Sequence, residues 1–205
     1  WLQDANYAKT SGYDADGQMT WNAAMTWADQ LVYGGYDDWR LPTIVDTGTP
    51  GCNVANSGTD CGYNVQTADT GTNPVTVYSE LAYMYYVNLG LKGYFDTSGG
   101  VQVDWGIFGD GTGGNGRQNN VGLINNLQSF VYWSGAEYTP NSNFAWYFNA
   151  LYGLQNAFYK DNVVYAWAVR SGDVAVAPPS IPEPGSLALV GLGVIALGAA
   201  RRRRG

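Results

Sequence analysis

Carboxylates are the groups of this 205-residue chain that could act as general acids or bases. The chain contains no histidine, which removes the commonest general base, the commonest transition-metal ligand and the Ser-His-Asp arrangement. A glycosidase needs two carboxylates that face each other across the scissile bond. Glu80, Glu137, Asp104 and Asp110 could supply such a pair, but nothing in their spacing requires it. We therefore predict that the protein is not an enzyme, with a glycan-active hydrolase as the third-ranked alternative.

Two acidic segments carry oxygen ligands of the kind that calcium prefers. The first is Asp14-Ala15-Asp16-Gly17, and the second runs from Asp104 to Asp110 and continues into a glycine-rich stretch. Neither segment completes the twelve-residue EF-hand pattern. Ordinary Asp-Gly turns are the favoured interpretation, and a calcium ion at Asp104 and Asp110 is the alternative. We expect no other cofactor.

Sixteen tyrosines and eight tryptophans make aromatic side chains the main candidates for ligand contact. A ring exposed on a loop can stack on the apolar face of a sugar at low entropic cost. Trp133, Trp146 and Trp167 sit in strand-like patterns, which places them in the core; for Trp105, burial in the core and surface contact both stay open. The candidate ligand-binding residues lie in loops and turns: Trp105, Phe108, Tyr138, Asn141 and Asn143.

The part of the chain up to Ser180 is strongly acidic. It contains six basic and sixteen acidic residues, a net charge of −10, whereas the whole chain has a net charge of −7. Affinity for phosphate backbones comes from lysine and arginine, so nucleic acid is excluded as a partner. Cys52 and Cys61 are the only cysteines. In an exported chain they favour a disulfide that closes a small loop, worth about 2–3 kcal/mol in the chain-entropy model.

Two helices and several strands are expected to position these residues. Thr20 to Leu31 begins with a cap residue and has apolar residues at helical spacing up to a Gly-Gly stop. A second helix begins after Ser79, a cap candidate, and ends at Gly90. Three runs of aromatic and β-branched residues are predicted to be antiparallel strands, 130–134, 144–148 and 163–169. The third is expected to be a central strand because both of its faces are apolar.

The end of the chain has three parts in order. Pro182, Glu183 and Pro184 come first, residues 187–200 are all apolar or small, and the third part is Arg201, Arg202, Arg203 and Arg204. A fourteen-residue helix reaches about 21 Å, and snorkelling arginines extend it to a marginal span of the ~30 Å hydrocarbon core. Arginines favour the cytoplasmic side, so the preceding residues are expected to face outward.

This tail resembles the PEP-CTERM sorting signal of Gram-negative bacteria. The resemblance implies recognition by the membrane protease exosortase and delivery to the cell surface or the exopolysaccharide matrix. An ordinary C-terminal anchor helix is the alternative and gives the same topology. The chain begins at Trp1 without the charged and apolar segments of a secretory signal peptide, which we expect to have been removed or left out.

Four motifs follow one another along residues 1–171. They are Gly34-Gly35-Tyr36-Asp37-Asp38-Trp39-Arg40-Leu41-Pro42-Thr43, Glu80-Leu81, Tyr132-Trp133-Ser134 and Ala166-Trp167-Ala168-Val169-Arg170. This series resembles the DUF1566 family, also called the Lcl C-terminal domain, and its Trp-Arg-Leu-Pro-Thr core is the most specific part. The resemblance implies an α+β fold of the C-type-lectin-like or formylglycine-generating-enzyme-like kind, with two helices, small antiparallel sheets and long Gly-rich loops.

The sequence departs from this family in three ways. Gly135 stands where the family has a second serine, the final motif Trp167-Ala168-Val169-Arg170 lacks the family's cysteine before the arginine, and the acidic surface does not suit sulfated glycosaminoglycans. No cysteine follows Cys61, so the chemistry of the formylglycine-generating relatives is excluded as well. The resemblance therefore implies the fold and a general adhesive role, but not that ligand class.

The motif residues themselves are expected to be structural, with ligand contact as the alternative. An arginine between two apolar residues is partly buried, so it must pair with a carboxylate or with backbone carbonyls. Asp37, Asp38 and Glu80 are the candidate partners. The structural set is Trp39, Arg40, Leu41, Pro42, Glu80, Trp133 and Arg170.

These observations predict a DUF1566-like domain at 1–172, a linker at 173–180 and a sorting signal with a short transmembrane helix at 181–205. We predict an exported, non-catalytic, lectin-like protein that is transiently anchored in the inner membrane. It is then displayed on the outer surface or in the extracellular matrix, where it binds carbohydrate, such as exopolysaccharide, or a protein partner in adhesion. The alternative of a different class is a structural envelope or matrix protein that self-associates without binding sugar.

Overall fold

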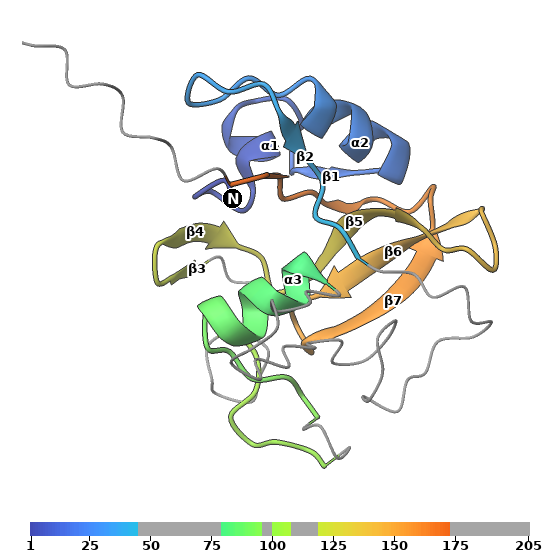
Figure 1. Ribbon diagram of the computed structural model, residues 1–205. Coiled ribbons are helices and arrows are strands. Elements are labelled where there is room, and N and C mark those ends of the chain that lie inside the picture. Colours follow the sequence, from blue (N-terminus) through green and yellow to red (C-terminus); the bar gives the residue numbers. More distant parts are fainter. Residues whose placement is uncertain (45–78, 96–99, 108–118, 173–205) are drawn as a thin grey trace, which may run out of the picture. The chain divides into compact units, whose positions relative to one another are not determined.

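The computed structural model describes residues 1–44, 79–95, 100–107 and 119–172 (Figure 1). The chain divides into two compact units, Trp1–Ser171 and Gly172–Gly205, and the fold described below is that of the first. It is a mixed α+β fold with mostly β structure. No helix among the described residues is long and apolar enough to cross a membrane. The linker and the tail helix predicted at 187–200 lie outside them.

Both predicted helices form, and both begin at the predicted cap. Helix α2, Trp21–Asp29, follows Thr20, whose hydroxyl accepts a hydrogen bond from the Ala23 amide. Helix α3, Glu80–Tyr83, follows Ser79 in the same manner and continues as a π-helix, η1, Met84–Asn88. Gly90 then ends the helix at a φ of +63°, the left-handed conformation that glycine adopts without strain. A four-residue helix, α1 (Tyr7–Thr10), was not predicted.

A five-stranded sheet forms the main β structure, and Figure 1 shows its long strands β5, β6 and β7 side by side. The strand order is β1-β8-β5-β6-β7, with all neighbours antiparallel except β5 and β8. The first two predicted strands are confirmed as β5 and β6, whereas β7 was missed. The strands are β1 (Gln18–Met19), β5 (Val131–Glu137), β6 (Phe144–Asn149), β7 (Leu154–Tyr159) and β8 (Val164–Tyr165).

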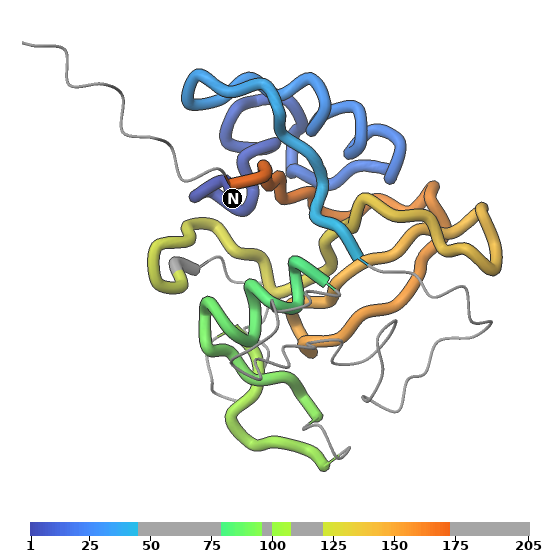
Figure 2. Tube along the Cα trace, viewed as in Figure 1, coloured from blue at the N-terminus to red at the C-terminus, as the bar shows by residue number. Residues whose placement is uncertain are grey.

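The predicted central strand 163–169 is wrong as a single element. Its first part, β8, is central, between β1 and β5. The chain then leaves the sheet, and β9 (Val169–Arg170) pairs with β2 (Trp39–Arg40) instead. The physical reason is competition from the start of the chain, because the Leu2 amide donates to the Ala168 carbonyl at 3.0 Å. Figure 2 shows the start of the chain beside this late segment.

The remaining strands form a small ribbon that also contacts the N-terminal segment. Strands β3 (Asn119–Val121) and β4 (Ile124–Leu127) are antiparallel. The amide of Ala5 donates to the carbonyl of Asn125 at 2.9 Å, so the first residues of the chain lie between this ribbon and the segment before β9.

The core is built around tryptophans. Trp133, Trp146 and Trp167 are at most 2% exposed, as their strand-like surroundings predicted. Buried indole N–H groups need acceptors, and Trp133 donates to the Met19 carbonyl at 2.9 Å while Trp167 donates to the Leu2 carbonyl at 2.8 Å. Each of these bonds joins segments more than 100 residues apart. The rings therefore hold the early and late parts of the chain together.

Candidate functional site

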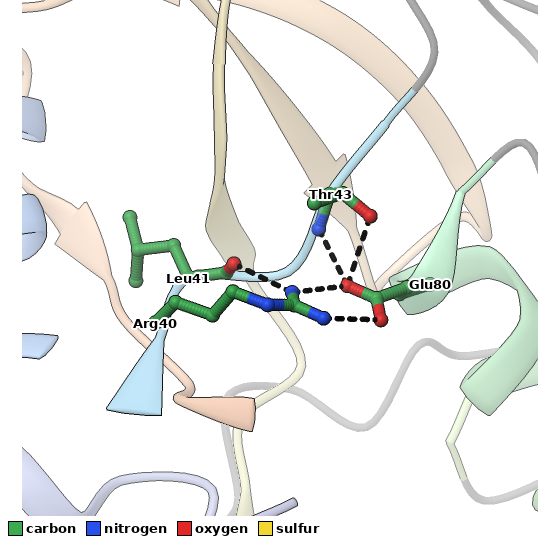
Figure 3. Close-up of polar contacts among 4 residues, drawn as sticks. All are labelled: Arg40, Leu41, Thr43 and Glu80. Carbon is green, nitrogen blue, oxygen red and sulfur yellow. Dashed lines mark hydrogen bonds and ion pairs between the residues drawn. The ribbon is translucent and has the colours of Figure 1, made fainter. Parts of the chain in front are cut away.

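The Trp-Arg-Leu-Pro-Thr motif is held by an ion pair between Arg40 and Glu80 (Figure 3). The guanidinium donates to both carboxylate oxygens, at 2.6 and 2.9 Å, and to the Leu41 carbonyl at 3.2 Å. Glu80 also accepts from the amide of Thr43 at 2.7 Å and from its hydroxyl at 3.0 Å. We call these residues the Arg40–Glu80 clamp. Of the three carboxylates proposed from the sequence as partners of Arg40, the structure brings Glu80 to it.

The clamp is electrostatically satisfied. Burial alone would raise the pKa of Glu80, but the hydrogen bonds from Arg40 and Thr43 outweigh it, and the net pKa is lowered. The hydrogen bonds that Arg40 donates to Glu80 likewise raise the pKa of Arg40. A carboxylate held this firmly as an anion by four hydrogen bonds has little capacity left for a ligand or for proton transfer. The clamp is therefore a structural device that ties β2 to α3.

A second arginine of the motifs is paired in the same region. Arg170 donates to both oxygens of Asp38, at 2.7 and 3.0 Å, and its guanidinium carbon lies 3.7 Å from the centroid of the Tyr36 ring. The pKa of the Asp38 carboxyl is lowered, mainly by the hydrogen bond from Arg170. Asp37 of the candidate set takes no part in either pair.

The departure at Gly135 has a packing reason. The Gly135 amide donates to the Pro42 carbonyl at 2.8 Å. A Cβ at position 135 would lie 3.3 Å from the Leu41 carbonyl oxygen, closer than ordinary contact. Leu41 and Pro42 are themselves fully buried. Close approach of β5 to the motif thus favours glycine at the position where the DUF1566 pattern that this sequence resembles has serine.

Trp105 lies in a cluster of three aromatic rings, which we call the aromatic cluster. It stacks on Tyr152, with ring centroids 5.4 Å apart and planes inclined by 30°. Tyr94 packs edge-on against both rings, at 5.1 and 5.7 Å. Trp105 is half-buried, and Tyr152 is 39% exposed. The cluster therefore presents part of a stacked aromatic pair to solvent.

The other predicted ligand residues form a different feature. Tyr138, Asn141 and Asn143 lie in the turn between β5 and β6, where Tyr138 packs edge-on against Trp146 at 5.2 Å. Asn141 and Asn143 are exposed, and the Asn141 side chain accepts from the Asn143 amide at 3.1 Å. This turn precedes β6 and Tyr152 follows it, so the two features lie roughly 20 Å apart along a six-residue strand.

The structure therefore does not bring the predicted ligand residues together. Sequence reasoning also missed Tyr94 and Tyr152, because nothing local marks a tyrosine as the partner of a tryptophan many residues away. Several predicted positions lie outside the described residues. These are Phe108, Asp110, Cys52, Cys61 and the sorting-signal residues Pro182, Glu183, Pro184, Arg201, Arg202, Arg203 and Arg204.

Asp104 and Asp14, from the two acidic segments considered for calcium, have partners within the protein. Asp104 pairs with Lys92, whose hydrogen bond lowers the pKa of the Asp104 carboxyl. One oxygen of Asp14 accepts from the amides of Asp16 and Gly17, at 3.1 and 2.8 Å, which is the arrangement of an ordinary Asp-Gly turn. Within the described ranges, no group of three or more acidic or cysteine side chains could hold a metal ion.

The comparisons with known proteins concern the end of the chain. Residues 180–204 match the family of the PEP-CTERM protein-sorting motif. No curated protein matches the chain, and neither does any solved structure. The resemblance of residues 1–171 to the DUF1566 family is not shown by a family match and stays a prediction. The chain thus carries a PEP-CTERM signal, which is recognised by exosortase and indicates export and surface sorting in a Gram-negative bacterium.

Proposed function

We propose that residues 1–172 are a non-catalytic, lectin-like domain that the sorting signal delivers to the cell surface or the extracellular matrix, where it binds neutral or amine-bearing carbohydrate. The observation that carries the proposal is the half-exposed, stacked pair of Trp105 and Tyr152. A flat aromatic surface held in place by Tyr94 can stack on a pyranose ring without losing rotamer freedom. The ligand is an exopolysaccharide or another surface glycan.

The surroundings of this pair support a contact surface. Val101 and Val103, in the segment before Trp105, are 60% and 87% exposed. Gln102 between them donates to the carbonyls of Gly93 and Phe95, at 2.9 and 3.1 Å, so the exposed valines sit on an anchored backbone. Exposed apolar side chains beside an aromatic pair are typical of a binding surface.

The carboxylates support a binding role over catalysis. Glu80 is paired with Arg40, Glu137 with Lys160 at 2.6 Å, and Asp104 with Lys92. A glycosidase requires one carboxyl group that stays protonated and another that stays free as a base or nucleophile. Hydrogen bonds from cations hold Glu80 and Asp104 as anions instead, since each lowers the carboxyl pKa.

The test is binding of the full chain, held in detergent, to cellulose, chitosan and dextran. We expect retention on one of these polysaccharides and at least a tenfold loss of affinity for Trp105→Ala, since base- or sugar-sized stacking contacts are worth about 1–3 kcal/mol. Tyr13→Ala is the matched control, because Tyr13 is an exposed tyrosine outside the aromatic cluster. No retention on any of the three, or equal affinity of Trp105→Ala and wild type, would contradict the proposal.

A second candidate function is self-association in the envelope or matrix, and one observation favours it. Strand β7 is an outer strand of the sheet within the described residues, and Phe158 and Tyr159 on it are 36% and 58% exposed. Unpaired strand edges are templates for pairing with another chain. This function requires sugar-independent oligomers of the full chain in analytical ultracentrifugation, which a charge on the edge, Phe158→Lys, should dissolve.

A further inference from the structure

A polar groove lies away from the aromatic cluster. Its volume is about 310 Å³, and it is lined by Lys9, Thr10, Asp16, Asn126, Gln128 and Tyr165. A neighbouring depression of about 160 Å³ shares Gln128 and Tyr165 and adds the ring of Phe130, which is 45% exposed. Together they form a continuous surface of amide, carboxylate, hydroxyl and ammonium groups beside an aromatic ring. The size lies at the lower end of the range for small-molecule sites.

The floor of the groove is a fixed piece of backbone. Asn126, on β4, has a φ of +59°, the only left-handed non-glycine conformation among the described residues. Asparagine tolerates this region better than most residues. The side-chain amide of Asn126 donates to the Asp4 carboxylate at 2.8 Å. The backbone carbonyl of Asn126 accepts from the Gln128 side-chain amide at 2.8 Å. These bonds orient both amides that face the groove.

The wall is fixed by a buried asparagine. Asn6 is only 5% exposed, and its amide nitrogen donates to the Asp16 carbonyl at 3.3 Å. Its Oδ1 has no hydrogen-bond partner in the described part of the chain. That oxygen lies where a side chain at position 17 would begin, since a Cβ on Gly17 would be 1.8 Å from it. Asn6 and Gly17 therefore interlock, and this holds the turn that carries Asp16.

Several groups in the groove keep unused hydrogen-bonding capacity. The Tyr165 hydroxyl and the Lys9 ammonium have neither a hydrogen-bond nor an ion-pair partner among residues 1–44, 79–95, 100–107 and 119–172. Within the described part of the chain, the Asp16 carboxylate accepts from the backbone and side chain of Gln18, at 2.9 and 3.3 Å, whereas a carboxylate can accept about four bonds. In the Arg40–Glu80 clamp, by contrast, the charged groups have their hydrogen-bonding capacity taken up by other protein groups.

We propose that the groove binds one sugar residue of a polysaccharide through hydrogen bonds to its hydroxyl groups. Asp16 and Tyr165 face adjacent hydroxyls, the Gln128 amide bridges the two parts of the groove, and the Phe130 ring packs against the apolar face of the next residue. The groove would bind the same class of ligand, a carbohydrate, as in the proposed function on which this rests, but through residues outside the aromatic cluster.

The experiment measures amide chemical shifts and binding isotherms of the full chain in detergent, with cellotriose and triacetylchitotriose as probes. We expect one probe to shift the amides of Asp16, Asn126 and Gln128. Tyr165→Phe removes only the hydroxyl and Asp16→Asn only the charge, and each should weaken binding about tenfold, the worth of one or two hydrogen bonds. Tyr13→Phe and Asp29→Asn are the matched controls, since both side chains are exposed and neither lines the groove.

The outcomes separate this inference from the proposed function. Shifts in the groove with loss of binding in the two groove variants support it, whatever Trp105→Ala does. Shifts confined to Trp105 and Tyr152, with wild-type affinity in both groove variants, overturn it and leave the proposed function standing. Absence of binding by either trisaccharide overturns the groove proposal, while the proposed function is judged separately by retention on the polymers.

Discussion

The Arg40–Glu80 clamp and the polar groove contain the same kinds of side chain, but in the clamp these side chains stabilise the fold and in the groove they are available to a ligand. In the clamp, every charge has a protein partner, and Glu80 alone accepts from Arg40 and Thr43. In the groove, the Tyr165 hydroxyl and the Lys9 ammonium have no hydrogen-bond or ion-pair partner among the described residues. Satisfied polar groups stabilise a fold, whereas unsatisfied ones at a surface are available to a ligand. Hydrogen-bond saturation therefore distinguishes structural from binding residues where residue type does not.

The largest effect is expected from Glu80→Gln. The substitution leaves the Arg40 guanidinium without its counter-charge at a site where the Glu80 side chain is 24% exposed. We expect a loss of about 2–4 kcal/mol in the free energy of unfolding. Urea unfolding followed by tryptophan fluorescence measures it. Glu137→Gln is the control, because its ion pair with Lys160 leaves Glu137 51% exposed and is worth less than about 1 kcal/mol.

Acid should weaken the same clamp without any mutation. The pKa of Glu80 is lower in the folded protein than in the unfolded chain, despite burial, because Arg40 and Thr43 donate to it. Its contribution is therefore complete above the unfolded glutamate pKa of about 4.3 and is lost as the pH falls through the folded pKa. Melting temperatures from pH 7 to pH 2.5 should fall, and more steeply in wild type than in Glu80→Gln. Equal slopes would show that Glu80 is not the titrating group.

A smaller effect is expected at the wall of the groove. Gly17 and Gly12 both have a positive φ, +84° and +78°, but only at Gly17 would a Cβ collide with Asn6. We expect Gly17→Ala to destabilise the fold by about 1–3 kcal/mol and Gly12→Ala by about 1 kcal/mol. The difference between the two variants in urea unfolding measures the interlock. If the two are equal, Asn6 does not fix this turn.

The smallest effect on stability is expected from Asp16→Asn. Asp16→Asn makes the same chemical change as Glu80→Gln, but the asparagine oxygen can still accept from the Gln18 amide. We expect the free energy of unfolding to change by no more than about 0.5 kcal/mol. A loss as large as that of Glu80→Gln would place Asp16 among the structural residues and remove the contrast between the two regions.

Local patterns predicted the helices well because their signals are short-range. Thr20 and Ser79 cap helices by bonding an amide three residues on, so the neighbouring sequence suffices to find them. The short strands were harder to predict. Strand β9 has two residues, and its place depends on β2, which is more than 100 residues earlier in the chain. The run 163–169 looked like one strand because its composition cannot report competition from Leu2.

The candidate ligand residues show the same contrast between short-range and long-range signals. Trp105 was recognised from the sequence as an aromatic residue in a loop, but its partners Tyr94 and Tyr152 were not. Tyr138 lies at the other end of β6. Among the groove residues, the sequence pointed to Asp16 alone, as part of an acidic segment suited to calcium, and none was predicted to contact a sugar, since the members come from three distant segments. Amides and hydroxyls carry no signal in a sequence until the fold shows which of them lack partners.

The sorting signal, the acidic charge of residues 1–180 and the starts of α2 and α3 can be read from the chain before it is folded, because each depends on neighbouring residues or on composition. The pairing of Glu80 with Arg40 and of Asp38 with Arg170, and the shared groove of Asn126 and Tyr165, follow from the folded chain alone. The reason is physical: a hydrogen bond or an ion pair forms between groups a few ångströms apart, and packing of the whole core sets that separation.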